Sequence, residues 1–213
     1  MINTIFFDFD GVIAESVDIK TNAFAKLFER EGKTIVEKIV EYHRHNTGVS
    51  RYDKFRYFYR EILGRPLPDD EFQRLCDMFS ALVTDEVVRA PYVKGALEFL
   101  QTYSPRYSSY IVSATPQQEM EDIVARRKIG SFFKKIYGSP IKKEAAVKET
   151  LNNENILPEN AVYIGDAKSD YEAAVLNGVH FIARTGENDP VFKDIPCRKI
   201  YDLTPLHGII QEL

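Results

Sequence analysis

Four short apolar runs constrain the fold of this chain more than any other feature of its sequence. They are rich in Ile, Val, Phe and Tyr, and they lie at residues 4–7, 110–112, 161–164 and 179–183. Each lacks the polar alternation of a half-exposed strand, a pattern typical of strands that are buried on both faces of a parallel sheet. Weaker strand candidates lie at 135–137 and 199–201.

Helical stretches separate these runs. The stretch at 117–129 ends at Gly130 and the stretch at 169–177 ends at Gly178, and glycine is the usual residue just after a helix. Strands that alternate with helices predict an α/β fold built on a doubly wound parallel sheet.

Residues 15–90 break this alternation, because helical patterns follow one another there without a convincing strand. Tyr52, Phe55, Tyr59 and Ile62 form an apolar stripe at helical spacing. We interpret the stripe as packing inside a small helical bundle in preference to an aromatic platform for a ligand.

Composition narrows the class of partner. The chain has 213 residues, 44% hydrophobic and 28% charged, with a formal charge of −4, so it has no bulk positive field to attract nucleic acid or an anionic membrane. Cys76 and Cys197 lie far apart without metal-ligand spacing, which favours a reducing compartment. The N-terminal apolar run is too short for a signal peptide, so a cytoplasmic location is expected.

Two aspartates follow the first apolar run directly, in the segment FFDFDGVI. Asp8 is expected at the carboxyl end of a buried strand, the edge at which open α/β sheets bind ligands, and Asp10 in the next loop. An ordinary strand-ending turn would explain this pair equally well. However, Asp166 and Asp170 follow the third apolar run and reach the same edge. Four carboxylates predict a site for a hard cation, and Mg²⁺ is the usual choice when phosphate is also bound.

Two further motifs indicate a bound anion. The segment SATP, with Ser113 and Ala114, is expected at a helix start, where free backbone N–H groups face an anion, although capping alone would also explain it. Lys142 and Lys143 stand in the first turn of a predicted helix, where the macrodipole disfavours cations. Helical spacing places Lys143 on the apolar face, so it is the one expected to point toward the core.

This motif pattern resembles that of the haloacid dehalogenase (HAD) superfamily, and the resemblance covers nearly the whole chain. The positions that carry it are Asp8, Asp10, Gly11, Ser113, Lys143, Gly165, Asp166 and Asp170. Within that superfamily, the motif pattern most resembles the subgroup that contains phosphoglycolate phosphatases and β-phosphoglucomutases. The resemblance implies a Rossmann-like α/β core domain at residues 1–14 and 91–213 and an inserted α-helical cap domain at 15–90.

The resemblance also implies a mechanism, hydrolysis of a phosphate monoester through an aspartyl-phosphate. Asp8 would be the nucleophile and needs no base, because a carboxylate is already anionic at neutral pH. Asp10 would be the acid and base, with neighbouring carboxylates favouring its protonated form. Ser113, Ala114 and Lys143 would bind the phosphate.

Mg²⁺ is the cofactor that the resemblance implies. Its expected ligands are Asp8, Asp10, Asp166 and Asp170. Asp10 would contribute its backbone carbonyl, and Asp170 would either bind the metal or orient another ligand.

Several functions compete with a phosphatase. Haloacid dehalogenases and phosphonoacetaldehyde hydrolases lack an acid at the position of Asp10, so phosphate-ester chemistry is favoured over theirs. The segment at 48–51, GVSR, resembles a cap segment of β-phosphoglucomutases, which makes a phosphomutase the main alternative. Lys20 stands where those mutases place a histidine, which favours the hydrolase. A non-catalytic binding protein of the same fold is disfavoured, because every chemical position is filled.

The substrate is expected to be a small phosphate ester such as a sugar phosphate or phosphoglycolate, and the sequence does not choose among them. Lys20, Arg51 and Lys54 are candidate cap residues for the part that is not transferred, and a solvated helix-start arginine is an equal alternative for Arg51. We expect no nucleic-acid or membrane partner and a monomer or weak dimer.

Overall fold

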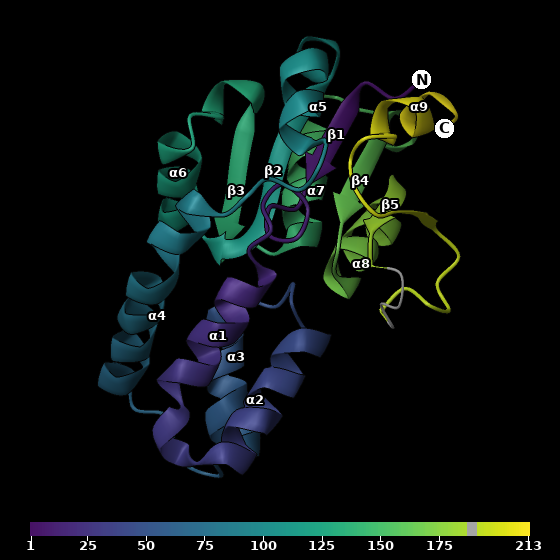
Figure 1. Cartoon of the computed structure of the whole chain (residues 1–213). Coiled ribbons are helices and arrows are strands. Elements are labelled where there is room, and N and C mark those ends of the chain that lie inside the picture. Colours follow the sequence, from purple (N-terminus) through teal and green to yellow (C-terminus); the bar gives the residue numbers. More distant parts are fainter. Residues whose placement is uncertain (187–190) are drawn as a thin grey trace.

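The computed structural model describes residues 1–186 and 191–213. It contains a parallel sheet with helices on both faces and a second group of helices at one edge of the sheet (Figure 1). The strands are β1 (Thr4–Phe7), β2 (Ser108–Pro116), β3 (Lys135–Ser139), β4 (Ala161–Gly165), β5 (His180–Arg184) and β6 (Arg198–Ile200). The helices are α1 (Val17–Leu27), α2 (Lys33–His45), α3 (Arg51–Tyr57), α4 (Asp69–Arg89), α5 (Ala96–Tyr103), α6 (Gln117–Arg126), α7 (Lys143–Asn153), α8 (Lys168–Asn177) and α9 (Leu206–Gln211).

The sheet has six strands in the order β3-β2-β1-β4-β5-β6, and all of its described pairs are parallel. The central strand β1 pairs with β2 on one side and β4 on the other, so that Phe7 lies opposite Ile111 and Ile164. The strand order reverses beside β1, and such a reversal opens a crevice at the carboxyl ends of the strands. This topology confirms the predicted doubly wound α/β fold.

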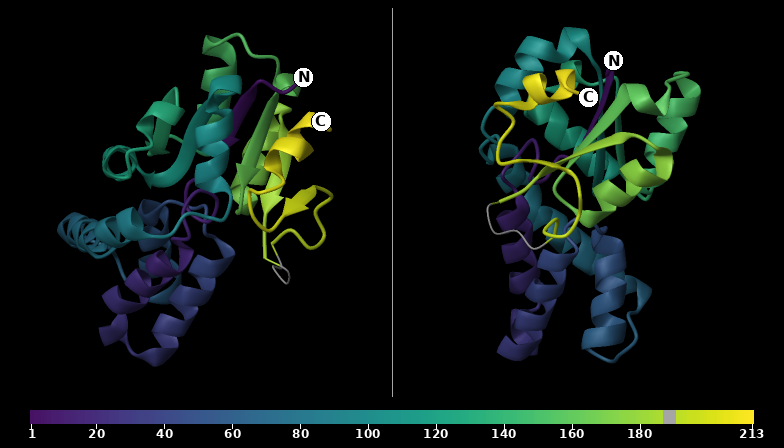
Figure 2. Two further views of the ribbon diagram at one scale, coloured as in Figure 1. Left: turned by 45° about the horizontal axis from the view of Figure 1, so that its top comes forward. Right: turned by 90° about the vertical axis from the view of Figure 1, so that its right-hand side faces the viewer.

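The two faces of the sheet are covered by different helices, as the further views show (Figure 2). Phe6, Tyr110 and Tyr163 point to the face that α7 and α8 cover. Ile5 and Phe7 point to the other face, which α5, α6 and α9 cover. Because both faces are buried, the strands need apolar side chains at successive positions, which explains the unbroken apolar runs.

Helices α1 to α4 pack around an aromatic cluster at the carboxyl edge of the sheet (Figure 1). Phe24 of α1 lies at its centre, with ring centroids 5.7 Å from Phe55, 5.5 Å from Phe58 and 4.4 Å from Phe79. The helix after Arg51 is α-helical to Tyr57 and then π-helical over Phe58–Ile62. Phe55 and Tyr59 are buried in the bundle, so the packing interpretation of the aromatic stripe is confirmed.

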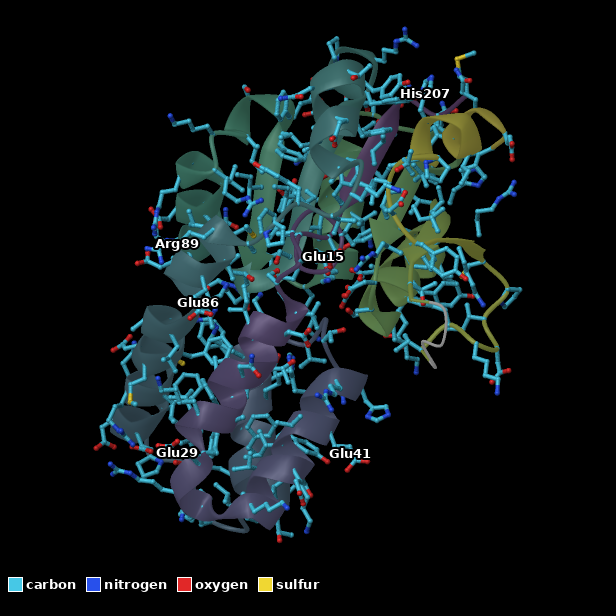
Figure 3. The ribbon with its side chains drawn as sticks, viewed as in Figure 1. Glu15, Glu29, Glu41, Glu86, Arg89 and His207 are labelled. Carbon is cyan, nitrogen blue, oxygen red and sulfur yellow. The ribbon has the colours of Figure 1, made fainter. Side chains whose placement is uncertain are left out.

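Two linkers join the helical group to the sheet. Ala14 forms bridges to Asp10 and to Tyr92, which brings the outgoing and returning chain together. Glu15 lies at this junction (Figure 3) and accepts hydrogen bonds from Arg184 at the end of β5, one of them at 2.6 Å. At the second linker, Arg127 donates to the carbonyls of residues 87, 88 and 90, which end α4.

The helix expected after the SATP segment is present, because α6 begins at Gln117. Ser113 and Ala114 lie in the last part of β2, which is longer than the expected strand and continues to Pro116. The pairing of β2 with β3 shifts register between Val112 and Pro116, so this stretch leaves the regular ladder while it stays extended. Within residues 1–186 and 191–213, no helix combines the length and the apolar character needed to cross a membrane.

Candidate active site

A cavity of about 30 Å³ lies between the carboxyl edge of the sheet and the helical group. Its lining includes Asp8, Asp10 and Asp166 from the sheet side and Lys20, Arg51 and Lys54 from the helices. The volume is roughly that of one or two water molecules, less than a phosphate ester needs. The helical group therefore sits closed over the strand ends in this structure.

Asp8 directly follows the central strand β1 and makes three hydrogen bonds. Its backbone N–H donates to the Ile164 carbonyl at 2.9 Å, which continues the ladder to β4. The side chain accepts hydrogen bonds from the Phe9 N–H at 2.7 Å and from Lys143 Nζ at 2.9 Å. Burial raises the pKa of Asp8, Lys143 opposes this, and the negative charges of Asp170 and Asp10 add to it, giving about 7.

Asp8, Asp166 and Asp170 form a carboxylate cluster in which one oxygen of each lies within 4.8 Å of the others. Asp170 is fully buried and accepts from Lys143 Nζ at 2.6 Å and from the Ala167 N–H at 3.0 Å. Burial, together with the charges of Asp8 and Asp170, raises the pKa of Asp166 well above its usual value. Asp8 and Asp170 are buried and Asp166 is half-buried. One lysine beside three carboxylates does not balance their charge when all are ionised, and these oxygen donors suit a divalent hard cation.

Gly11 makes room for this cluster. Its φ is +76°, a conformation that favours glycine, and a Cβ at this position would lie 2.2 Å from Asp166 Oδ2. The glycine after the two aspartates therefore serves both the turn and the close approach of Asp166.

Asp10 differs from the sequence-based expectation. Its carboxylate accepts from Ser16 Oγ at 2.6 Å and Thr115 Oγ1 at 3.2 Å, and it forms an ion pair with Lys20. Burial alone would raise the pKa of Asp10, but the ion pair with Lys20 and these hydrogen bonds lower it. The expectation that neighbouring carboxylates keep Asp10 protonated is therefore wrong for this closed arrangement. Its side chain also points to Lys20 rather than joining the three-carboxylate cluster.

The phosphate-binding candidates come from β2 and α7, and Lys143 among them contacts Asp8. Ala114 lines the cavity, and the Ser113 hydroxyl is buried next to it, accepting from the Thr115 N–H at 3.1 Å. Lys143 opens α7 and bridges Asp8 and Asp170, whereas Lys142 is exposed. Burial alone would lower the pKa of Lys143, but Asp170 and Asp8 raise it, so the ammonium stays charged.

The three cap candidates all reach the cavity, but two of them contact carboxylates of the protein. Lys20 contacts Asp10 and donates to Thr115 Oγ1 at 2.7 Å. Arg51 pairs with Glu119 of α6, so it is not a solvated helix-start arginine. Ser50 caps α3 by accepting from the Asp53 N–H at 3.2 Å, which fixes Arg51 in the first turn.

Lys54 is buried, and the two groups that its Nζ contacts are uncharged. Its Nζ donates to His43 Nδ1 at 2.8 Å and to the Thr47 carbonyl at 3.3 Å. Burial, more than any nearby charge, lowers the pKa of Lys54 well below its ordinary value.

Sequence reasoning missed several residues of this site. They are Ser16, His43, Ser80, Thr115 and Glu119. Each is a common polar residue at an unremarkable position in its segment, and its role depends on a side-chain contact that appears only in the folded structure. For Ser80, Thr115 and Glu119 that contact joins distant parts of the chain. Thr115 alone lay in a segment that had been singled out, directly after Ser113 and Ala114.

Together the fold and the site define an α/β enzyme with carboxylates and a lysine at the carboxyl edge of a parallel sheet, beneath a helical cover. More particularly, the chain belongs to the haloacid dehalogenase-like hydrolase family, whose model matches residues 5–184. This match confirms the resemblance found in the motifs.

Relatives and solved structures agree with this assignment. The chain is 24% identical over 186 residues to a phosphorylated carbohydrates phosphatase of Thermotoga maritima, covering 85% of this chain and 84% of the relative. It is 25% identical over 217 residues to a phosphoglycolate phosphatase of Pseudomonas putida, covering 95% and 77%. Among solved structures it is similar to the HAD hydrolase YfnB of Bacillus subtilis bound to magnesium, with a TM-score of 0.74, 18% identity and 99% coverage of both chains.

Proposed function

We propose that this protein is a Mg²⁺-dependent phosphatase that hydrolyses a small phosphate monoester through an aspartyl-phosphate on Asp8. The observation that carries the proposal is the position of Asp8, which contacts Lys143 and lies in the carboxylate cluster with Asp166 and Asp170. Two relatives named as phosphatases of phosphorylated carbohydrates and of phosphoglycolate support the substrate class.

The metal site is part of the proposal. Asp8, Asp166 and Asp170 would hold Mg²⁺, and the backbone carbonyl of Asp10 is proposed as a further ligand. When bound, the ion neutralises charge on the transferring phosphoryl group and lets an anionic nucleophile approach it. The magnesium bound to the Bacillus subtilis hydrolase supports this choice of ion.

The protein groups would divide the chemistry as follows. Asp8 attacks phosphorus. Lys143 orients the Asp8 carboxylate and neutralises charge on the phosphoryl oxygens, and Ser113 and the backbone at Ala114 bind another phosphoryl oxygen. Asp10 takes a proton from the water that hydrolyses the aspartyl-phosphate. Asp10 has to be protonated before it can donate to the leaving alkoxide in the first step, and protonation requires that it separate from Lys20. Lys20 lies on α1, so opening of the helical group to admit substrate would free Asp10 to take up this proton before the group closes.

The helical group is proposed to act as the cap, with a core domain of residues 1–14 and 91–213 and a cap domain of residues 15–90. The small cavity supports this division, because substrate entry requires the two parts to move apart. The two free cysteines support a cytoplasmic location, and we propose a monomer or weak dimer.

A hydrolase is favoured over the phosphomutase alternative. A mutase has to hold a second phosphate on the cap side of its site, and Arg51, the candidate cation of its GVSR segment, is paired with Glu119.

Phosphate release from a panel of small monoesters tests the proposal. Wild-type protein with Mg²⁺ is expected to release phosphate, and chelation is expected to stop the release. Asp8→Asn is expected to abolish it, because the amide lacks the charge that attacks phosphorus and binds the metal. Release by Asp8→Asn at the wild-type rate would refute the mechanism.

A further inference from the structure

A buried ion pair links the helical group to the sheet. Arg51 of α3 donates from Nη1 to Glu119 Oε2 at 2.9 Å, and its Nη2 contacts Glu119 Oε1. Ser80 of α4 joins both partners, accepting from Arg51 at 2.7 Å and donating to Glu119 at 2.6 Å. The Arg51 and Glu119 side chains are 4% and 9% exposed, so water screens the pair little.

This pairing determines whether the Arg51 guanidinium is available to bind an anionic ligand. A carboxylate on both terminal nitrogens occupies the fork that would otherwise bind a phosphate or carboxylate bidentately. The guanidinium still lines the cavity, stacked 4.4 Å from the Phe79 ring centroid, but it does so as half of a neutral pair. The same holds for Lys20, which is paired with Asp10.

Lys54 is the third cation on this wall, and its surroundings also oppose charge. The groups that its Nζ contacts, His43 Nδ1 and the Thr47 carbonyl, carry no negative charge. Burial, with Lys54 and Lys20 nearby, lowers the pKa of His43 to about 2, so the ring is neutral. The remaining cap-side lining includes Val17, Phe24, Val49 and Phe79.

We propose that the cavity selects phosphate monoesters of uncharged alcohols, and that Glu119 sets this selectivity by withholding Arg51 from a second anionic group. This inference rests on the proposed phosphatase function and names its substrate class. When the helical group closes over a bound ester with this pairing intact, a second anion would meet no unpaired guanidinium among the described residues that line the cavity, so its lost hydration would not be replaced. Glu119 touches no reacting atom and acts through Arg51, which makes it a positioning residue.

Two size-matched ligands test this selectivity. Ethylene glycol monophosphate ends in a hydroxyl, and phosphoglycolate ends in a carboxylate. Their dissociation constants are measured by calorimetry without added metal on the Asp8→Asn protein, which keeps Lys143 and Ser113 for the transferred phosphate and is expected to bind both esters without turning them over. The ethylene glycol ester is expected to bind about tenfold more tightly, because the carboxylate of phosphoglycolate loses hydration that Arg51, paired with Glu119, does not replace.

Variants assign the effect to Glu119. Adding Glu119→Gln is expected to shift the ratio of the two constants about tenfold toward phosphoglycolate, because it frees the charge of Arg51. Adding Glu121→Gln, which removes a charge from an exposed position of the same helix, is expected to leave the ratio unchanged. Adding Arg51→Gln together with Glu119→Gln is expected to return the ratio to its starting value, because neither charge is then present.

The selectivity proposal is overturned if Glu119→Gln leaves the ratio of the two dissociation constants within twofold of its starting value, or if Glu121→Gln shifts the ratio equally. It is overturned as well if the variant with both Arg51→Gln and Glu119→Gln keeps the shift. It is also overturned if none of the proteins binds either ester. Failure of the phosphatase function would appear separately, as absence of phosphate release by the protein with Asp8 intact.

Discussion

A single buried lysine determines the charge state of the candidate site. Lys143 contacts Asp8 and Asp170 at 2.9 and 2.6 Å and is 5% exposed. Removing its ammonium would take away the cation that contacts Asp8 and Asp170. The neighbouring Lys142 is exposed and carries the same charge without these contacts. The pair Lys143 and Lys142 therefore separates a local electrostatic role from a general effect of charge.

We predict that Lys143→Ala lowers kcat/KM at least a hundredfold, the size of loss seen when a preorganised charge-stabilising group is removed. Lys142→Ala is expected to stay within about twofold, because its side chain is exposed. Steady-state kinetics on one phosphate ester, with circular dichroism to verify folding, measures both. Equal losses in the two variants would contradict the role given to Lys143.

His43 gives a pH-dependent prediction that is independent of catalysis. Its pKa is about 2 in the folded protein and about 6.5 in the unfolded chain, so the unfolded state binds the proton first as pH falls. The stability that neutral His43 contributes is thus present above pH 6.5 and declines by roughly 1.4 kcal/mol per pH unit below it. His43→Asn is expected to remove this slope, since an amide oxygen can still accept from Lys54 but does not titrate.

Urea unfolding of both proteins at pH 7, 6, 5 and 4 measures the effect. The difference between wild type and variant isolates His43 from the carboxylates that titrate in the same range. Parallel stability curves for the two proteins would show that His43 is protonated in the folded state.

Residues differ in how far the sequence alone could identify them. Asp8, Asp166 and Lys143 follow strand ends or a helix start, and periodicity places such positions at the edge of a parallel sheet. The partner of Arg51 could not be identified in this way, because Glu119 is 68 residues away on an element of the other structural group. The charge state of Asp10 was mispredicted for a different reason, since its contact with Lys20, only 10 residues along the chain, depends on how α1 packs against the strand ends.

At the scale of elements, α1 holds the helical group together. Its Phe24 is 1% exposed and contacts rings of α3, the π-helical turn and α4. The spacing of the aromatic residues predicted a covered face, but it could not show that one phenylalanine would join three elements. A cavity at the position of Phe24 would remove contacts from α3, the π-helical turn and α4 at the same time.

Phe24→Ala is expected to lower the free energy of unfolding by about 3–5 kcal/mol, the usual cost of truncating a fully buried phenylalanine. Leu176→Ala, at a position that is 74% exposed, is expected to change it by less than about 0.5 kcal/mol. Denaturant unfolding compares the two variants. A loss below 1 kcal/mol for Phe24→Ala would show that the bundle repacks around the missing ring.

At the scale of the whole molecule, the closed arrangement depends on a close approach between the two groups. The Gly48 carbonyl accepts from Ser169 Oγ at 3.3 Å, next to the carboxylate cluster. A Cβ on Gly48 would lie 2.1 Å from Ser169 Oγ and 2.8 Å from the Ala167 side chain. Any side chain at residue 48 therefore opposes closure without touching the reacting groups.

Gly48→Ala is expected to lower kcat/KM about tenfold or more while the melting temperature stays unchanged, because closure excludes water and completes the site. Gly130→Ala is the matched control, since its Cβ would meet nothing closer than 3.6 Å. Kinetics and thermal unfolding of both variants measure the effect. An unchanged kcat/KM for Gly48→Ala would show that catalysis does not need this contact.

The central position of β1 has a consequence for how the chain is made. Its residues 4–7 leave the ribosome before both of their ladder partners, which lie at 108–111 and 161–164. The contacts within the aromatic bundle, in contrast, span residues 24–79. The nascent chain can therefore compact its helices before the sheet forms, while the apolar strand β1 stays unpaired until residues 108–111 and 161–164 have been translated.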